Sequence, residues 1–297
     1  MQRMQRTLRA RTLREGDWEI LIGRIKEGKC TPFLGAGACA DVLPLASDIA
    51  NEWADRYKYP LPDHKNLIQV AQFLTVEYGD SEFAKRLVKQ RIETVTPNFA
   101  LPDEIHSVLA GLPLPLYITT NYDDYMVQAL ALKQNKKPVK ELCRWNKFIK
   151  SKSIFEEEDD FSPSEERPIV FHLHGHTGNL YSMVLTEDDY LDFLINVAAD
   201  RDSLPSRVVQ AFTDTSLLFL GYRLADANFR VVFRSLVGYL QSNFSKAHVS
   251  VQLEPEGLTE EQMEKALDYL DSYFKELKVR VYWGTCQEFA ADLRSRM

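Results

Sequence analysis

The sequence lacks the features that define several common classes of protein. Its four cysteines are scattered and form no Cys-x-x-Cys pair, which argues against a cysteine zinc site and fits free thiols in a reducing cytoplasm. No apolar run approaches the roughly 18–20 residues that span a bilayer. The net charge of −7 argues against a general nucleic-acid-binding surface. With 45% hydrophobic and 27% charged residues, the composition predicts a soluble, cytoplasmic globular protein.

Acidic residues are absent from the start of the chain, where the first acid is Glu15. Arg-rich, acid-poor starts occur in organelle transit peptides, which is one alternative. The segment runs directly into sequence with a helical apolar stripe, so we expect residues 1–16 to form a basic N-terminal arm. Its basic residues are Arg3, Arg6, Arg9, Arg11 and Arg14.

The rest of the chain alternates between short apolar runs and helical periodicity. The apolar runs predict buried strands at 30–34, 115–119, 168–173, 216–221, 247–253 and 278–283. Helical spacing is found at 17–28, 45–57, 122–134, 186–199, 203–213, 226–243, 259–277 and 287–296. Such alternation is typical of an α/β protein with a Rossmann-like, doubly wound parallel sheet.

One long stretch departs from this alternation. Residues 61–112 carry three helical stripes and no strand pattern, which predicts a helical insertion between the first two strands. We therefore expect a helical insertion subdomain at 46–112. The Rossmann-like domain would consist of residues 17–45 and 113–297.

A glycine turn follows the first predicted strand. Gly35, Ala36, Gly37 and Ala38 begin a G-x-G-x-x-A pattern, and glycines there allow close approach of the backbone to a phosphate. The following helix N-terminus would favour an anion. A simple strand-to-helix turn explains the pattern equally well. No second strand ending in an acid follows at the usual distance, so a standard dehydrogenase site is not predicted.

The second predicted strand ends in Thr119-Thr120-Asn121-Tyr122-Asp123. Asn121 carries both a donor and an acceptor, which suits orienting a water, a ribose hydroxyl or an amide. Asp123 has two alternatives, which are capping the next helix and contacting a ligand.

The strand at 168–173 runs into His174 and Gly175. A histidine can exchange a proton near physiological pH, and the glycine leaves room for a ligand beside it. Because strand side chains alternate, we expect His172 and His174 to share one face. Metal binding by the nearby histidines is a weaker alternative, since no carboxylate or cysteine stands at a ligand spacing.

A fourth polar cluster follows the strand at 216–221. Gly221 allows another close approach, and Arg223 could neutralise a phosphate. Asp226 and Asn228 either cap the next helix or contact a ligand.

The order GAG, TTNYD, LHG and GYxLxDxN resembles the sirtuin-like family, in its bacterial antiphage-defence branch, over about residues 17–253. The resemblance implies that the glycine turn holds NAD phosphates, that Asn121 lies near the nicotinamide ribose, and that His174 is the catalytic base. Gly221 and the Asp226 region would lie along the adenosine side. The expected catalytic residues are thus Asn121 and His174. The expected NAD-binding residues are Gly35, Ala36, Gly37, Ala38, Thr120, Asp123, Gly175, Gly221, Tyr222, Asp226 and Asn228.

One departure from the family pattern narrows the expected activity. Protein deacylases of this family carry a four-cysteine zinc module after the LHG motif, and this chain has no such cysteines. No zinc is therefore expected. The resemblance favours an NAD hydrolase that releases nicotinamide and ADP-ribose and acts as the NAD-depleting effector of antiphage defence. An NAD-dependent deacylase and a non-catalytic subunit that binds NAD or ADP-ribose are the alternatives.

Partner expectations follow from the same resemblance. An NAD hydrolase without a sensor would be toxic unless restrained, so we expect regulation by assembly. The expected assemblies are a homo-oligomer or a complex with a HerA-like hexameric ATPase. Neither a membrane nor direct nucleic-acid binding is expected.

Overall fold

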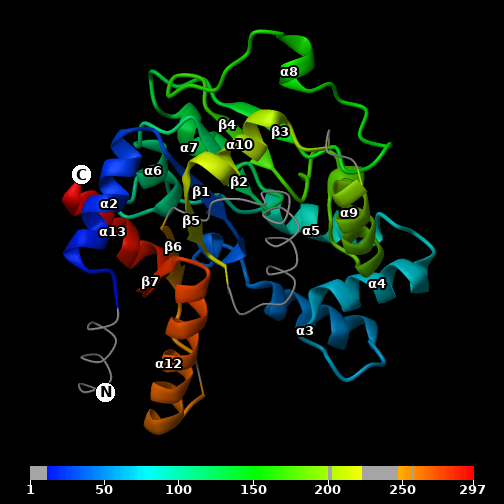
Figure 1. Ribbon diagram of the computed structural model, residues 1–297. Helices are drawn as coiled ribbons and strands as arrows, with labels where there is room; N and C mark the ends of the chain where they lie inside the picture. Colours follow the sequence, from blue (N-terminus) through cyan, green and yellow to red (C-terminus); the bar gives the residue numbers. More distant parts are fainter. Residues whose placement is uncertain (1–11, 200–202, 223–246, 256) are drawn as a thin grey trace.

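A seven-stranded parallel sheet forms the centre of the protein (Figure 1). The computed structural model describes residues 12–199, 203–222, 247–255 and 257–297. The strand order is β3-β4-β2-β1-β5-β6-β7, and every strand pair is parallel. The strands are β1 (Cys30–Leu34), β2 (Leu116–Thr119), β3 (Val139–Leu142), β4 (Ile169–His172), β5 (Ser216–Leu220), β6 (His248–Gln252) and β7 (Val279–Trp283). This order confirms the predicted doubly wound sheet, with the chain reversing direction across the sheet at β1 and β5.

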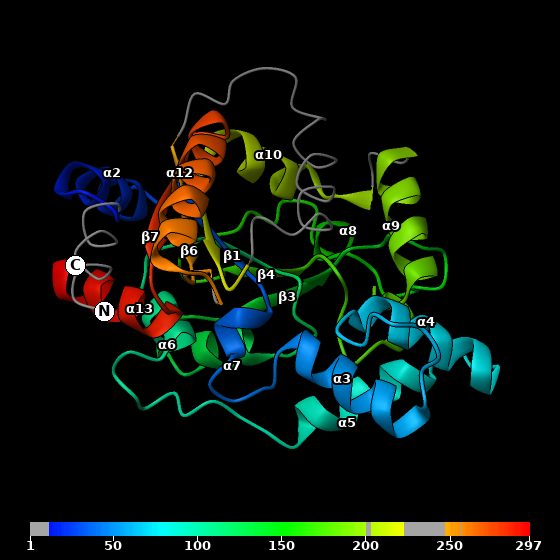
Figure 2. The ribbon, with the colours of Figure 1, turned by 90° about the horizontal axis from the view of Figure 1, so that it is seen from below.

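Helices cover both faces of the sheet, because successive strand residues point to opposite sides. Phe33 faces one hydrophobic core and Leu34 the other. Figure 2 shows α6, α7 and α13 on one side of the strands and α10 and α12 on the other. The first core is covered by α9 (Glu187–Ala199), α10 (Ser206–Asp214) and α12 (Glu260–Glu276). The second is covered by α2 (Glu15–Lys26), α6 (Ile105–Ala110), α7 (Tyr125–Ala131) and α13 (Cys286–Arg296).

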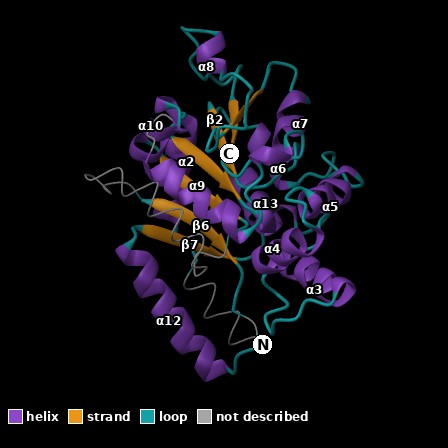
Figure 3. Ribbon diagram, turned by 90° about the vertical axis from the view of Figure 1, so that its right-hand side faces the viewer, coloured by secondary structure: helices purple, strands orange, loops and turns teal. Residues whose placement is uncertain are grey.

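A third core belongs to the helices between β1 and β2. These are α3 (Ala46–Tyr57), α4 (Leu67–Tyr78) and α5 (Phe83–Glu93), which group beside the sheet in Figure 3. Their core also takes in Met183 and Leu185, from the segment between β4 and α9. The predicted helical insertion between the first two strands is therefore present. The last helix before β2, α6, packs against α7 and α13 in the second core instead.

The structure differs from the sequence prediction in two elements. The edge strand β3 was not predicted, because its sequence Val-Lys-Glu-Leu contains two charged residues and no apolar run. It pairs with β4 alone among the described strands. The second is the short helix α8 (Ile154–Glu157), which is absent from the predicted helices and which Ser153 caps. The cap from Ser153 thus stabilises one helical turn in a stretch rich in acidic residues.

Some predictions fall outside the described residues. These are residues 1–11 of the basic arm predicted at 1–16, whose last two residues begin α2, the helix at 226–243, and the side chains of Arg223, Asp226 and Asn228. Within the described part of the chain, no helix combines the length and the apolar character needed to cross a membrane.

Candidate active site

The predicted polar clusters lie side by side at the carboxyl edge of the sheet. Strands β4, β2, β1 and β5 are neighbours in that order, so the turns that follow them meet. The Leu173 N–H donates to the Thr119 carbonyl (2.8 Å), and the Gly35 N–H donates to the Leu220 carbonyl (2.8 Å). This edge, at the point where the strand order reverses, is where open parallel sheets bind ligands.

The two glycine turns of the site pack against each other. A Cβ on Gly37 would lie 2.9 Å from the Gly221 Cα, and a Cβ on Gly221 would lie 2.1 Å from the Ala38 nitrogen. The Gly37 N–H donates to the Gly221 carbonyl (3.0 Å), and Gly221 has a φ of +74°. The close approach that these glycines allow is therefore made between the two turns. A phosphate contact by the Gly37 N–H would compete with this bond.

Tyr222 bridges the ends of β1 and β2. Its ring would lie 2.8 Å from a Cβ placed on Gly35. Its hydroxyl donates to the Leu34 carbonyl (2.8 Å) and lies 2.5 Å from the Thr120 hydroxyl. Burial raises the pKa of Tyr222 well above its ordinary value, so the phenol stays protonated. Tyr222 and Thr120, both predicted to contact NAD, thus lie together at the carboxyl ends of β1 and β2.

Asn121 uses its amide nitrogen to contact the first glycine turn. Its Nδ2 donates to the Gly35 carbonyl (3.2 Å) and to Cys39 Sγ (3.3 Å). Its backbone N–H donates to the Thr119 hydroxyl (3.0 Å). Within the described part of the chain, the side-chain oxygen of Asn121 accepts no hydrogen bond. That oxygen is available to a substrate or a water.

Asp123 is buried and engaged within the protein. One carboxyl oxygen accepts the Tyr125 N–H (2.9 Å) at the start of α7, and the other lies 3.7 Å from Cys39 Sγ. Burial raises the pKa of Asp123 above its usual range, an effect that His106 partly opposes. This geometry favours the helix-capping alternative over a direct ligand contact.

His174 lies beneath α9, just beyond the end of β4. Its ring makes edge-to-face contacts with Tyr190 (5.3 Å) and Phe193 (5.1 Å). Its Nε2 is buried and has no hydrogen-bond partner among the residues that the structure describes. Burial lowers the pKa of His174 to about 3, so the imidazole is neutral at physiological pH. A buried imidazole nitrogen without a partner costs free energy, and such a group is a candidate for contact with a ligand.

His172 and His174 do not share neighbours, contrary to expectation. The strand ends at His172, and a turn closed by the Gly175 N–H and the His172 carbonyl (3.3 Å) redirects the chain. The His172 ring contacts His176 (5.0 Å) instead of α9. Burial, and then nearby His176, lower the pKa of His172 to about 3. Side chains alternate between the two faces only within a strand, and His174 lies beyond the end of β4.

His176 belongs to a polar cluster that the sequence did not predict. Its Nδ1 accepts the Gly178 N–H (2.8 Å), which places its proton on Nε2, 3.0 Å from Asp124. Lys140 lies 3.0 Å from the same carboxylate. Burial opposes ionisation of Asp124, but the bonds from His176 and Lys140 hold its pKa below its usual range. No single motif links these residues, because Lys140 comes from the unpredicted strand β3.

The remaining predicted residues occupy different positions at this edge. Gly175 has a φ of +84°, and a Cβ there would lie 2.0 Å from the Ser182 carbonyl oxygen. The space beside Gly175 is therefore filled by the protein. Ala36 is exposed at the tip of its turn, whereas Ala38 is buried.

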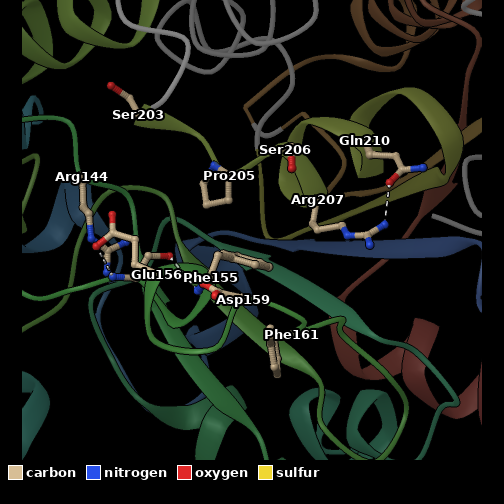
Figure 4. Close-up of a pocket in the computed structure, with 11 residues that line it drawn as sticks. Arg144, Phe155, Glu156, Asp159, Phe161, Ser203, Pro205, Ser206, Arg207 and Gln210 are labelled. Atoms are coloured by element: carbon tan, nitrogen blue, oxygen red, sulfur yellow. Dashed lines mark hydrogen bonds between the residues drawn. The ribbon is translucent and has the colours of Figure 1, made fainter.

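A cavity of about 460 Å³ lies apart from these residues (Figure 4). It is bounded by the connection from β3 to β4 and by the start of α10, and its lining includes Arg144, Phe155, Asp159 and Arg207. Arg144 is held by Glu141 and by the carbonyls of neighbouring loop residues. None of the predicted site residues lines this cavity. Within the described residues, no group of three or more His, Cys, Asp or Glu side chains could hold a metal ion.

The fold and the strand-end residues define a class of protein. It is an α/β protein with two glycine turns at the reversal point of a parallel sheet, and an amide and a buried neutral imidazole after the two neighbouring strands β2 and β4. More narrowly, the chain belongs to the SIR2-like domain family, whose match covers residues 115–282. That match includes Asn121 and His174 and begins after the first glycine turn.

Curated relatives carry the name NAD(+) hydrolase ThsA. The protein of Enterococcus faecium is 26% identical over 242 residues, which cover 76% of this chain and 45% of that protein. The protein of Acinetobacter baumannii (strain 532279) is 23% identical over 237 residues, covering 77% of this chain and 44% of that protein. The protein of Cytobacillus dafuensis is 26% identical over 228 residues, with coverages of 73% and 40%. The chain thus spans about half the length of the curated relatives it matches.

Proposed function

We propose that this protein hydrolyses NAD at the bond between nicotinamide and ribose, releasing nicotinamide and ADP-ribose. The observation that carries the proposal is the placement of Asn121 and His174 at adjacent strand ends of a SIR2-like domain. The names of the curated relatives support the same substrate and reaction. The motif resemblance extends the proposal to a role as the NAD-depleting effector of antiphage defence.

The two residues have different tasks in this reaction. Nicotinamide leaves with the electrons of its bond to ribose, and a water adds to that ribose carbon and loses a proton. His174 is neutral, so it can accept a proton from the water or from a ribose hydroxyl. The Asn121 side-chain oxygen can accept a hydrogen bond that orients the same group. Holding the reacting groups in one geometry supplies much of the rate acceleration.

Substrate contact with His174 requires movement of the side chains around it. The Nε2 atom is buried, and Tyr190 and Phe193 of α9 pack against the ring. A site that is closed at rest is consistent with an enzyme whose activity is restrained until assembly. We propose that a homo-oligomer or a HerA-like hexameric ATPase provides that restraint or its release.

The test is nicotinamide release from NAD by the purified protein, alone and with a HerA-like ATPase. We expect release by the wild type and a loss of at least about 100-fold in His174→Ala, in line with removal of a general base. Calorimetric titration with ADP-ribose should show binding by both proteins. Binding without turnover in every condition would instead favour the non-catalytic subunit. Release that depends on added acetylated peptide would favour the deacylase.

A further inference from the structure

The amide of Asn121 has a defined orientation in this structure. Both hydrogens of Nδ2 are used, one toward the Gly35 carbonyl (3.2 Å) and one toward Cys39 Sγ (3.3 Å). Rotating the amide by half a turn would bring its oxygen against the Gly35 carbonyl. Two acceptors would then face each other, and the donor would lose both partners, which is costly in a half-buried position. The contacts of Nδ2 therefore determine where the side-chain oxygen points.

Cys39 is the less ordinary of these two acceptors. It ends the short 3-10 helix Ala36–Cys39 after the glycine turn, and it is 3% exposed. Burial, and then Asp123, raise the pKa of the Cys39 thiol well above its ordinary value, so the sulfur is not a thiolate nucleophile. A protonated thiol still accepts a weak hydrogen bond, and this one accepts from Asn121.

The sulfur is held in turn by a histidine of α6. His106 Nε2 lies 3.8 Å from Cys39 Sγ, and the His106 ring is 2% exposed. The ring also makes an edge-to-face contact with Tyr125 (6.0 Å). The first turn of α6 thus reaches the active-site edge through a buried side chain.

Glu104 sets the orientation of that imidazole. Its carboxylate lies 2.6 Å from His106 Nδ1 and accepts the backbone N–H groups of His106 (3.1 Å) and Ser107 (2.6 Å). Burial opposes ionisation of Glu104, but the bonds and the proximity of His106 lower its pKa on balance. A carboxylate at this distance accepts a hydrogen bond from Nδ1, and Nε2 then faces a sulfur whose own hydrogen is donated to Asp123 (3.7 Å).

We infer that Glu104, His106 and Cys39 are positioning residues that hold the Asn121 amide nitrogen against the glycine turn. Their contacts form one buried chain from the N-cap of α6 to the proposed catalytic amide. Asn121 then acts in the site as a hydrogen-bond acceptor only, which suits a water or a ribose hydroxyl. This inference rests on the proposed NAD hydrolysis for its kinetic consequence.

The kinetic test compares two buried cysteines at opposite ends of β1, of which only Cys39 lies at the carboxyl edge. Cys39→Ala should lower kcat for nicotinamide release by about 10- to 100-fold with little change in KM, as misorientation of a reacting group does. Cys39→Ser keeps an acceptor and should recover most of the loss. Cys30→Ala removes a buried thiol from β1 and is the matched control, with kcat near that of the wild type. His106→Phe keeps a ring against Tyr125 and should resemble Cys39→Ala.

A second measurement tests the orientation without relying on activity. Side-chain amide exchange of Asn121, followed by NMR in ¹⁵N-labelled protein, should be slow in the wild type and in Cys39→Ser. It should become faster in Cys39→Ala and in His106→Phe. Unchanged amide exchange in both, or an unchanged kcat, would overturn the inference. A wild type that releases no nicotinamide, either alone or with the ATPase, would refute the proposed function, while the exchange result would still decide the orientation.

Discussion

At the scale of single residues, burial rather than an ionic partner sets the chemistry of His174. Among the described residues the Nε2 atom has no hydrogen-bond partner, and desolvation by burial lowers the pKa of the ring. The imidazole is thus kept neutral, which is the form that accepts a proton. His176, four positions beyond the end of the same strand, is instead oriented by Asp124 and the Gly178 N–H. The two histidines are close in sequence, but their side chains have different neighbours and therefore different chemistry.

This burial predicts how stability depends on pH. Below pH 6.5 the unfolded chain protonates residue 174, whereas the folded chain does so only near its pKa of about 3. The contribution of neutral, buried His174 to the free energy of unfolding is therefore complete above pH 6.5. It is lost as the pH falls toward 3, by about 1.4 kcal/mol per pH unit for this one group. His174→Gln should have a shallower slope of unfolding free energy against pH, measured by urea titration between pH 6.5 and 4.5. Equal slopes in the two proteins would contradict this account.

At the scale of elements, α9 connects the helical insertion to the active-site edge. Its Tyr190 and Phe193 pack on His174, while its first turn bonds to Gln72 of α4 and to Lys85 of α5. Lys85 of α5 forms a buried ion pair with Asp189 (2.8 Å). Asp189 also accepts the N–H groups of the two residues before α9, so one carboxylate both caps the helix and joins it to α5.

Removing one partner of the Lys85–Asp189 ion pair should lower the free energy of unfolding. Lys85→Met leaves the Asp189 carboxylate buried without its cation, and we expect a loss of about 3 kcal/mol in the free energy of unfolding. The lower end of the usual range applies because Asp189 keeps its two backbone donors. Lys89→Met, on the same helix, removes an exposed pair with Glu93 (3.6 Å) and should cost less than about 0.5 kcal/mol. Denaturant titration of both variants gives the comparison, and similar losses would argue against a special role for Lys85.

At the scale of the whole molecule, the first and third hydrophobic cores are joined through the segment between β4 and α9, whose Val184 lies in the first core. Met183 and Leu185 are buried among the insertion helices, although they belong in sequence to the second half of the sheet. The insertion therefore completes its core only with residues that follow His174. Packing that crosses between parts of a chain in this way couples their unfolding.

Truncating Met183 should reveal that coupling. The side chain is fully buried, so Met183→Ala should destabilise the protein by about 2–5 kcal/mol. Hydrogen exchange should show lower protection in α4 as well as in residues 180–186. Met126→Ala is the matched control, because Met126 of α7 lies in the core beneath the sheet and should lower protection in α6 and α7. Unchanged exchange in α4 after Met183→Ala would indicate that the insertion folds as a separate unit.

The sequence predicted the elements whose pattern is local. Uninterrupted apolar runs such as 30–34 and 216–221 became central strands, and the stripes around Leu67 and Phe83 became α4 and α5. β3 was missed because an edge strand with charged residues has no such run. The sequence also placed Asn121 and His174 at strand ends, where their residue types suggested a site.

What the sequence determined by itself was the class of fold, the family resemblance, and the turns after β1, β2, β4 and β5 that carry polar groups. These depend on periodicity and on short motifs, which a linear pattern records. The contacts between those turns depend on the tertiary fold and could not be predicted from the sequence. The tertiary fold placed Gly37 against Gly221, directed His174 toward α9, and brought His106 of α6 to Cys39. Contacts between distant segments depend on strand order and side-chain burial, and no local spacing contains either.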